Sequence, residues 1–346
     1  MDTLNLLNTL LETPSPSGYE NSLQRRILDI ISPIVDKVDY DIHGNLIAYK
    51  YSIKENAKTV MLMAHADEIG LMVQYIEDGG FIRVSKIGGI DVSLLKGRKV
   101  VILHNGEKIS GVIGARPEHM NKEDMKSSID VSELWVDIGA CSRFESESLV
   151  AIGDPVILDS ECFSLSNNLV SGRACDDKAG IGSLIKALDI INARNSENQY
   201  NIVVVISVQE EVGSRGATTA TYKIKPDIGI AIDVTHASDY PTINKAKYGD
   251  VRLGNGVAIP IGTDLSICIQ RQLMETAKHH NIPYQALALP GHSWTDAHAI
   301  QVTRGGCLVG LLSIPCRYMH SPVEVVSTED VEYTAQLIAE YCLLPQ

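Results

Sequence analysis

The sequence predicts an α/β protein in which a mixed sheet lies between layers of helices and a small β-barrel is inserted into the chain. Two observations predict that helices cover both faces of the sheet. Short segments that are apolar on both faces are typical of central strands covered by helices on each side, and helical patterns alternate with them. A third observation predicts the insertion: between residues 70 and 160, short β-like pieces separated by glycines recur and no strong helical pattern appears. The apolar segments are residues 59–64, 202–208, 228–232 and 307–312.

Helical periodicity predicts the covering layers. In residues 19–31, Leu23, Ile27 and Ile31 fall on one stripe, as on one face of a helix. Thr263 and Asp264 are expected to cap the helix that they open. The same spacing of apolar residues predicts three further helices, over residues 178–193, 263–280 and 328–344.

The predicted barrel divides the chain into two parts. We expect it to occupy residues 69–164, so that residues 1–68 and 165–346 together form the domain with the large sheet. Within the insertion, residues 104–107 read His-Asn-Gly-Glu. The Asn-Gly pair predicts a tight hairpin, because both residues accept a positive φ.

Composition limits the classes of partner and the compartment. The 346 residues carry 43 acidic and 30 basic side chains, a formal net charge of −13, which argues against nucleic acid because phosphate binding requires clustered Lys and Arg. The cysteines are scattered without a Cys-x-x-Cys pair, as in reduced proteins of the cytoplasm. Apolar stretches are too short to span a bilayer, and the first residues lack the basic segment of a secretory signal. We expect a soluble, cytoplasmic protein with no membrane partner.

His65 and Asp67 follow the first apolar segment. His65 stands at the carboxyl end of a predicted strand, where open α/β sheets bind ligands. Asp67 lies on the same side if the strand continues, and a carboxylate beside a ligating His can fix its tautomer and raise its basicity. We interpret His65 as a metal ligand and Asp67 as its orienting partner; for a lone His, an ordinary loop position would be the better interpretation.

Two acidic pairs follow further along the chain. Asp176 and Asp177 precede a predicted helix, and helix capping explains one of them but not both. We interpret Asp176 as a ligand that could bridge two metals and Asp177 as a neighbour that caps. Glu210 and Glu211 follow the strand at 202–208, where adjacent side chains point to opposite sides. One of the two can therefore bind metal while the other faces the attacking water.

Asp233 and His320 follow the last two apolar segments and complete the constellation. Carboxylates combined with two imidazoles suit Zn²⁺, Co²⁺ or Mn²⁺ rather than copper or an iron–sulfur cluster. A two-metal hydrolytic site requires such a set of donors. The predicted metal ligands are His65, Asp176, Glu211, Asp233 and His320.

The motifs that carry these residues resemble a known family. In order they are AHADEIG, RACDDKAG, VQEEVGSRGA, AIDVTHA, TDA at 295–297 and RYMHSPVE, and they span nearly the whole chain. They resemble the glutamyl aminopeptidase and tetrahedral (TET) family of dinuclear metallo-aminopeptidases, some members of which were labelled endoglucanases. The resemblance implies a zinc-exopeptidase-like fold. One segment departs from the family: HSWTDAHAI has bulkier residues, Trp294 and His298, where glycines and small residues are frequent.

The resemblance also implies a role for each ligand. His65 and Asp233 match the ligands of one metal, and Glu211 and His320 match those of the second. Asp176 matches the carboxylate that bridges the two ions. Zn²⁺ or Co²⁺ is expected at both positions, and Mn²⁺ is a further candidate.

Catalytic roles and assembly follow from the same resemblance. Glu210 matches the general base and Asp67 the carboxylate that orients the ligand His. The expected reaction is release of N-terminal amino acids from peptides, with Glu210 taking the proton of a water shared by two metals and the resulting hydroxide attacking the first peptide carbonyl. The Asp176–Asp177 peptide bond is expected to be cis. Residues 69–164 are expected to drive dimerisation, and the dimers to build a hollow homo-dodecamer.

Other activities remain open at this point. A deacylase or amidase could use the same two metals on a non-peptide amide. A glycoside hydrolase could use the Glu pair, but it would leave His65, Asp233 and His320 without a role. The chain also has only 2 Trp and 3 Phe, few surfaces on which sugars could stack. A non-catalytic relative would be expected to lack a ligand or the base, and neither is missing.

Overall fold

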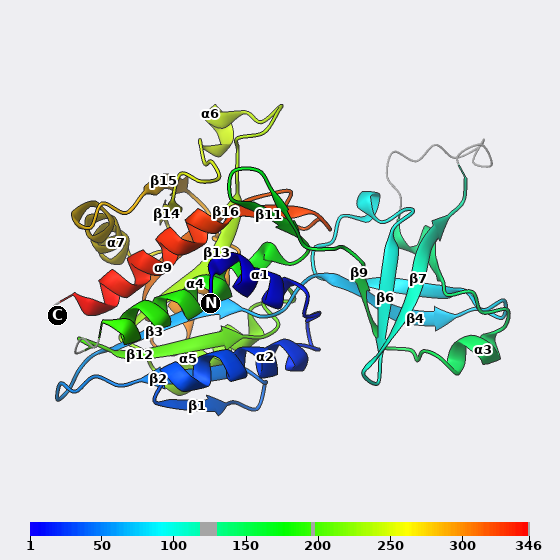
Figure 1. Ribbon diagram of the computed structural model, residues 1–346, viewed down its shortest axis with the longest axis horizontal. Helices are drawn as coiled ribbons and strands as arrows, with labels where there is room; N and C mark the ends of the chain where they lie inside the picture. The colour runs from blue at the N-terminus through cyan, green and yellow to red at the C-terminus, as the bar shows by residue number, and fades with distance from the viewer. Residues whose placement is uncertain (118–129, 195–197, 345–346) are drawn as a thin grey trace.

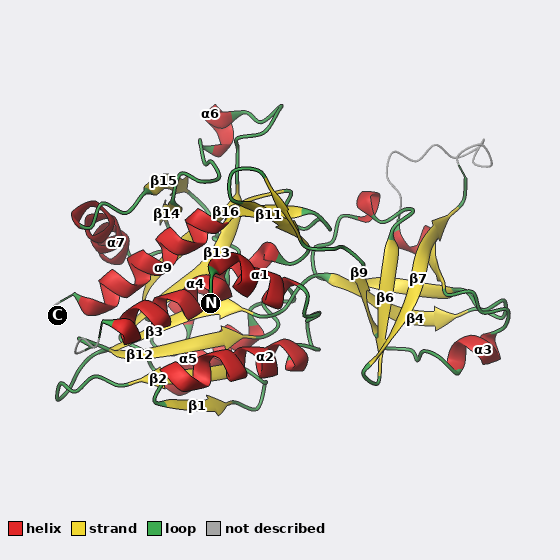
Figure 2. Cartoon of the chain, in the orientation of Figure 1, coloured by secondary structure: helices red, strands yellow, loops and turns green. Residues whose placement is uncertain are grey.

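The computed structural model describes residues 1–117, 130–194 and 198–344. Its described strands form a large mixed sheet and a closed barrel that lies at one end of the molecule (Figure 1). Helices lie on both faces of the large sheet, and the barrel is built almost entirely of strands (Figure 2). The predicted fold class is confirmed. Among the described residues, no helix combines the length and the apolar character that crossing a membrane requires.

The described helices and strands have the following bounds. The helices are α1 (Thr3–Leu11), α2 (Asn21–Ile31), α3 (Arg143–Glu147), α4 (Cys175–Ala193), α5 (Arg215–Ile224), α6 (Lys245–Tyr248), α7 (Ile267–His279), α8 (Asp296–Val302) and α9 (Thr328–Leu343), with 3₁₀ turns η1 (Ser32–Ile34), η2 (Val92–Leu94) and η4 (Val131–Glu133). The large sheet contains β1 (Lys37–Tyr40), β2 (Leu46–Lys50), β3 (Thr59–His65), β10 (Phe163–Leu165), β11 (Leu169–Gly172), β12 (Asn201–Ser207), β13 (Ile228–His236), β14 (Val257–Gly262), β15 (Tyr284–Leu289), β16 (Leu308–Arg317) and β17 (Glu324–Ser327). The barrel contains β4 (Gly70–Ile76), β5 (Ile82–Ile87), β6 (Lys99–His104), β7 (Glu107–Ala115), β8 (Leu134–Asp137) and β9 (Pro155–Leu158).

The four apolar segments form the centre of the large sheet. The strand order is β1-β2-β12-β3-β13-β16-β17-β11-β10, and β14 pairs with β15 and β16 beside this path. Strands β12, β3, β13 and β16 are parallel to one another. Their carboxyl ends therefore meet at one edge of the sheet, which is where open α/β sheets bind ligands.

Alternation along the central strands divides the core into two layers. Leu62 of β3 and Val204 of β12 pack on one face with buried residues of α1, α2, α4 and α9. Met61 and Met63 of β3 pack on the opposite face with buried residues of α5 and α8. This two-sided packing explains why the strands are apolar at successive positions.

The barrel has a separate apolar core. Its strands close in the order β4-β5-β8-β7-β6-β9, and buried residues such as Val73, Ile102 and Val136 fill the interior. The predicted hairpin joins β6 to β7: Asn105 and Gly106 have φ of 48° and 88°, and His104 pairs with Glu107. Both turn residues thus have the positive φ that this tight turn requires.

The predicted helices are present, but one predicted cap is wrong. The helix expected over 263–280 begins at Ile267, with Ser266 at the N-cap position. Asp264 does not cap it, because its carboxylate accepts the backbone N–H of Ser293, and the Thr263 hydroxyl donates to the carbonyl of Pro290. Both side chains therefore bind the loop after β15 instead of the helix.

Apolar periodicity did not predict several of the described helices, among them α1, α5 and α8. Helix α1 is only 9 residues long and buries Leu6, Leu7, Leu10 and Leu11 on one face, α5 contains three threonines of weak helix propensity, and α8 is only 7 residues long. Tertiary packing against the large sheet stabilises such segments more than local preference does.

Candidate metal centre

The candidate site lies at the carboxyl edge of the parallel strands. His65 is the last residue of β3 and pairs in register with Ser207, the last residue of β12. Asp233 lies near the end of β13, and Asp176 precedes the regular part of α4, where the helix backbone is interrupted. The fold thus brings His65 together with side chains that lie more than a hundred residues further along the chain.

The first group of donors consists of His65, Asp176 and Asp233. The Nε2 atom of His65 lies 3.0 Å from Oδ1 of Asp176 and 3.9 Å from Oδ1 of Asp233. All three residues are buried, and their donor atoms lie within 4.8 Å of one another. One imidazole and two carboxylates in this arrangement could hold a divalent ion.

The second group shares Asp176 with the first and adds Glu211 and His320. Oδ2 of Asp176 lies 3.4 Å from Nε2 of His320, and Oε1 of Glu211 lies 3.5 Å from the same nitrogen. The donor atoms of this group also lie within 4.8 Å of one another. Each carboxylate oxygen of Asp176 therefore faces a different histidine, which is the arrangement expected of a carboxylate between two ions.

Asp67 holds the turn that carries the Glu pair. Its carboxylate accepts the backbone N–H groups of Glu210 at 2.8 Å and Glu211 at 3.0 Å, and the hydroxyl of Ser17 at 2.6 Å. The closer contact of His65 Nδ1 is with the main-chain oxygen of Asp67, at 3.0 Å, whereas the carboxylate Oδ1 is at 3.5 Å. The main-chain oxygen of Asp67 therefore contacts His65 more closely than its carboxylate does, and the carboxylate fixes the position of Glu210 and Glu211.

Glu210 lies in the same turn but belongs to neither donor group. Its side chain receives a long contact of 3.4 Å from the Ser214 hydroxyl, and burial together with neighbouring carboxylates raises the pKa of Glu210 well above its ordinary value. The two glutamates lie in the turn after β12 and not in a continued strand. Their side chains nevertheless have different neighbours, because Glu211 contacts His320 and Glu210 belongs to neither donor group.

Asp177 and the peptide bond before it match their predictions. Oδ1 of Asp177 accepts the N–H of Gly180 at 3.1 Å, which caps the first regular turn of α4. Oδ2 accepts the backbone N–H of His65 at 3.3 Å. The Asp176–Asp177 peptide bond is cis.

Sequence reasoning missed Glu324 and Asp296. Glu324, the first residue of β17, accepts the backbone N–H of Asp176 at 3.0 Å with one oxygen and that of His320 at 2.8 Å with the other. Asp296, which opens α8, is buried and accepts the hydroxyl of Ser207. Glu324 is the last residue of the RYMHSPVE motif, and Asp296 is the aspartate of the TDA motif. An acidic residue within such a motif, at the start of a strand or helix, was the sequence signal that could have identified them.

Burial and charge at the site favour bound cations. Burial opposes charge on His65, but hydrogen bonds with Asp176 and Asp67 outweigh it and raise the pKa of His65 well above its ordinary value. Burial and neighbouring carboxylates raise the pKa of Glu211 and Asp233 well above the ordinary range. The site therefore carries more buried acid than its two imidazoles neutralise, and the hard oxygen and imidazole donors suit divalent ions of the zinc class.

The comparison with known proteins identifies the family. Residues 44–337 match the family described as M42 glutamyl aminopeptidase. The chain belongs to the M42 glutamyl aminopeptidase family. M42 membership confirms the resemblance found in the sequence and assigns the chain to the aminopeptidases, which are hydrolases that act on peptides.

Relatives along the whole chain agree with this assignment. A lysyl aminopeptidase of Pyrococcus furiosus is 35% identical over 336 residues, which cover 96% of this chain and 94% of that protein. The structure of an aminopeptidase from Desulfurococcus kamchatkensis has a TM-score of 0.92 at 34% identity, covering 98% of this chain and 94% of the other. A TET1 peptidase of Pyrococcus horikoshii, which can assemble into a tetrahedron or a large octahedral shell, has a TM-score of 0.87 at 32% identity and covers 99% of each chain. These similarities do not favour the glycoside hydrolase or the deacylase alternative.

Proposed function

We propose that this M42 protein is a dinuclear metallo-aminopeptidase that releases N-terminal amino acids from peptides with a free N-terminus. The observation that carries the proposal is the position of Asp176, whose two carboxylate oxygens lie 3.0 Å from His65 and 3.4 Å from His320. His65 and Asp233 would hold one ion with Asp176, and Glu211 and His320 would hold the other. Zn²⁺ or Co²⁺ suits these donors best, and Mn²⁺ is a further candidate.

When bound, the two cations would supply Lewis-acid polarisation of the substrate carbonyl and lower the pKa of bound water. Two neighbouring carboxylates accept hydrogen bonds from the backbone of the candidate site residues. Glu324 holds the backbone of Asp176 and His320, and Asp67 holds that of Glu210 and Glu211. Such outer hydrogen bonds keep the donors oriented before substrate arrives.

Glu210 is the proposed general base. It lies beside the donor groups without belonging to either, and its backbone N–H is held by Asp67. In this role its carboxylate takes a proton from the attacking water and returns it to the leaving amine. A carboxylate that already ligated an ion would be less able to carry that proton, which favours Glu210 over Glu211 for this step.

The decisive experiment compares a free aminoacyl anilide with its N-acetylated form. The protein is stripped with a chelator and reloaded with Zn²⁺, Co²⁺ or Mn²⁺ before each assay. We expect cleavage of the free-amine substrate only, its loss on chelation and its recovery on reloading. Preferred cleavage of the acetylated substrate would instead indicate a deacylase, and chelator-insensitive cleavage of a β-glucan would indicate a glycoside hydrolase.

Assembly and location complete the proposal. We propose that the part at residues 69–164 mediates dimerisation and that the dimers form a homo-dodecamer in the cytoplasm, with residues 1–68 and 165–346 as the catalytic part. The related TET1 peptidase of Pyrococcus horikoshii, whose shells are tetrahedral or octahedral, supports a closed assembly. Light scattering coupled to size-exclusion chromatography would test it, with the mass of twelve chains expected and the mass of one or two chains contradicting it.

A further inference from the structure

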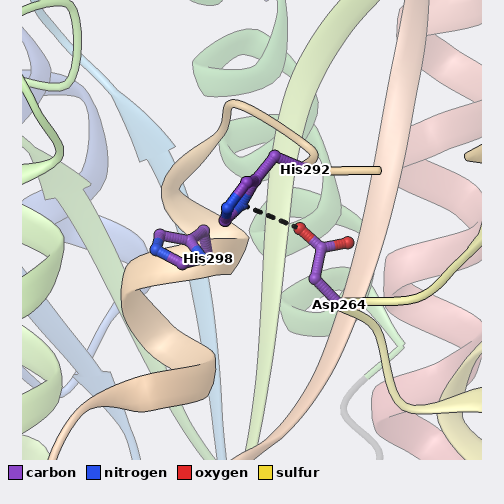
Figure 3. Close-up of side chains that lie close together, drawn as sticks. All are labelled: Asp264, His292 and His298. Atoms are coloured by element: carbon purple, nitrogen blue, oxygen red, sulfur yellow. Dashed lines mark ion pairs between the residues drawn. The ribbon is translucent and has the colours of Figure 1, made fainter. Parts of the chain in front are cut away.

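A third group of side chains that could hold a metal ion lies outside the candidate centre. It consists of Asp264, His292 and His298, which share no residue with the two groups described above. Figure 3 shows His292 and His298 close together, with Asp264 facing His292. Their ring nitrogens and one carboxylate oxygen lie within 4.8 Å of one another.

The sheet topology explains why these residues meet. Strands β14 and β15 are parallel, and their last pair is Gly262 with Leu289. Asp264 follows the end of β14 and His292 follows the end of β15, so both lie at the same edge. His298 is in the first turn of α8, which begins a few residues after His292.

The three side chains are already arranged by contacts among their loops. Oδ2 of Asp264 accepts the backbone N–H of Ser293 at 2.8 Å and lies 3.9 Å from Nδ1 of His292. The His292 and His298 rings pack edge to face, with centroids 4.5 Å apart. Thr295 caps α8 through the N–H of Ala297 and thereby fixes the helix start that carries His298.

Two polar atoms in this cluster are buried without a hydrogen-bond partner among the described residues. They are Oδ1 of Asp264 and Nδ1 of His298. Asp264 is only 9% exposed. A buried carboxylate oxygen and a buried ring nitrogen without partners destabilise the folded chain, because each has lost its hydrogen bonds to water without replacement. A cation at this position would supply the missing partner.

We propose that Asp264, His292 and His298 bind a third divalent transition-metal ion of the zinc class. Two imidazoles and a carboxylate form a recurring three-ligand set for Zn²⁺, in which further positions stay open to water or another ligand. Ligands held at about 2.0–2.2 Å from a tetrahedral ion lie about 3.3–3.5 Å from each other. The cluster needs only a small closure to reach that spacing, and the His292 side chain, 54% exposed, is free to make it.

An ion here would join the loop after β14, the loop after β15 and the start of α8. Asp296, the first residue of α8, accepts a hydrogen bond from the hydroxyl of Ser207. Ser207 in turn pairs with His65 in the sheet, at the ends of β12 and β3. The third ion would therefore hold a segment that borders the main centre without contributing a ligand to it. Its proposed role is to fix the 290–298 loop.

The experiment counts zinc on the purified protein. Metal-free protein is dialysed against buffered Zn²⁺, and the zinc bound per chain is then measured by inductively coupled plasma mass spectrometry. We expect His292→Ala and the double variant His292→Ala/His298→Ala to bind one zinc fewer per chain than the wild type. The matched control is His279→Ala/His280→Ala, two adjacent histidines near the carboxylate of Glu340, which should bind as much zinc as the wild type. Equal zinc in the wild type and in His292→Ala would overturn the proposal.

A second measurement uses the unmodified protein and excludes effects of misfolding. In crystals soaked with Zn²⁺, anomalous scattering at the zinc edge should place a peak between Asp264, His292 and His298. Zinc peaks elsewhere with none at this position would refute the third site even if the variants failed to fold. A His320→Ala variant distinguishes this proposal from the dinuclear one, because it should lose zinc from the main centre and keep the peak beside His292.

Discussion

Oδ1 of Asp67 lies 2.8 Å from the backbone nitrogen of Glu210, and this hydrogen bond joins the end of β3 to the turn that follows β12. The second oxygen of the same carboxylate accepts the N–H of Glu211 at 3.0 Å. One buried side chain therefore sets the position of both glutamates. A carboxylate suits this role because it accepts several hydrogen bonds and donates none.

The first prediction concerns Asp67→Asn. The amide can still accept one N–H, but its NH₂ group must face the other, so the turn should shift. We expect kcat to fall by about 10–100-fold, the usual range for partners behind a ligand shell, while bound metal falls little. Steady-state kinetics and metal analysis measure both. Asp91→Asn is the matched control, since Asp91 also accepts a backbone N–H but lies in the barrel part, and its kcat should not change. Equal kcat in the Asp67 variant and the wild type would show that the turn does not depend on this contact.

The second prediction separates the two glutamates. Glu210→Gln should retain wild-type metal content and lose about 10²–10⁴-fold in kcat, because proton transfer is removed while the donor groups are intact. Glu211→Gln should lose bound metal, since Glu211 belongs to the group with Asp176 and His320. Parallel metal analysis and single-turnover kinetics on the two variants measure the difference. A near-normal rate for Glu210→Gln would place the base elsewhere.

The third prediction concerns the shared ligand. Asp176→Asn should lower bound zinc by two ions per chain relative to the wild type, because both donor groups contain Asp176. Asp233→Asn and His320→Ala should each lower it by one, since each belongs to a single group. Elemental analysis after gel filtration gives the counts. Equal losses in all three variants would contradict the assignment of Asp176 to both ions.

The fourth prediction concerns stability away from the donors. Glu68 is buried and pairs with Arg173 and, at 3.1 Å, with Nζ of Lys178. Glu68→Gln would leave two buried cations without their counter-charge, which should cost about 3–5 kcal/mol of folding free energy. The midpoint of thermal unfolding should fall clearly at pH 7. Asp78→Asn, at the exposed ion pair with Arg143, is the control and should change it little.

The ion pairs of Glu68 with Arg173 and Lys178 make the stability loss of Glu68→Gln depend on pH. Burial alone would raise the pKa of Glu68, but Arg173 and Lys178 outweigh it and lower that pKa to about 2, from an ordinary value of 4.5. A lowered pKa stabilises the folded state above the ordinary value, and this stabilisation is lost as the pH falls from 4.5 toward 2. The difference in unfolding midpoint between the wild type and Glu68→Gln should therefore shrink across that window. A constant difference would show that packing, and not charge, explains the loss.

Much of the fold was predictable because local patterns report burial directly. The runs at 59–64 and 228–232 are apolar at successive positions because both faces of β3 and β13 are covered, and the Asn-Gly pair at 105–106 specifies its own turn. The positions of the acidic and imidazole residues were predictable for a related reason. Parallel strands end at one edge, so polar side chains that follow several buried strands must meet there.

Other features were decided by contacts between distant segments. The sequence alone determined that His65, Glu211, Asp233 and His320 follow apolar segments and that Asp176 precedes a helix, since both depend only on chain order and hydrophobicity. Tertiary structure alone decided that Asp264 binds the loop after β15 and not its own helix, and that Glu324 holds the backbone of two candidate ligands. The physical reason is that a hydrogen-bond acceptor is satisfied by whichever donor the packed chain brings within about 3 Å, and that donor can lie far along the chain.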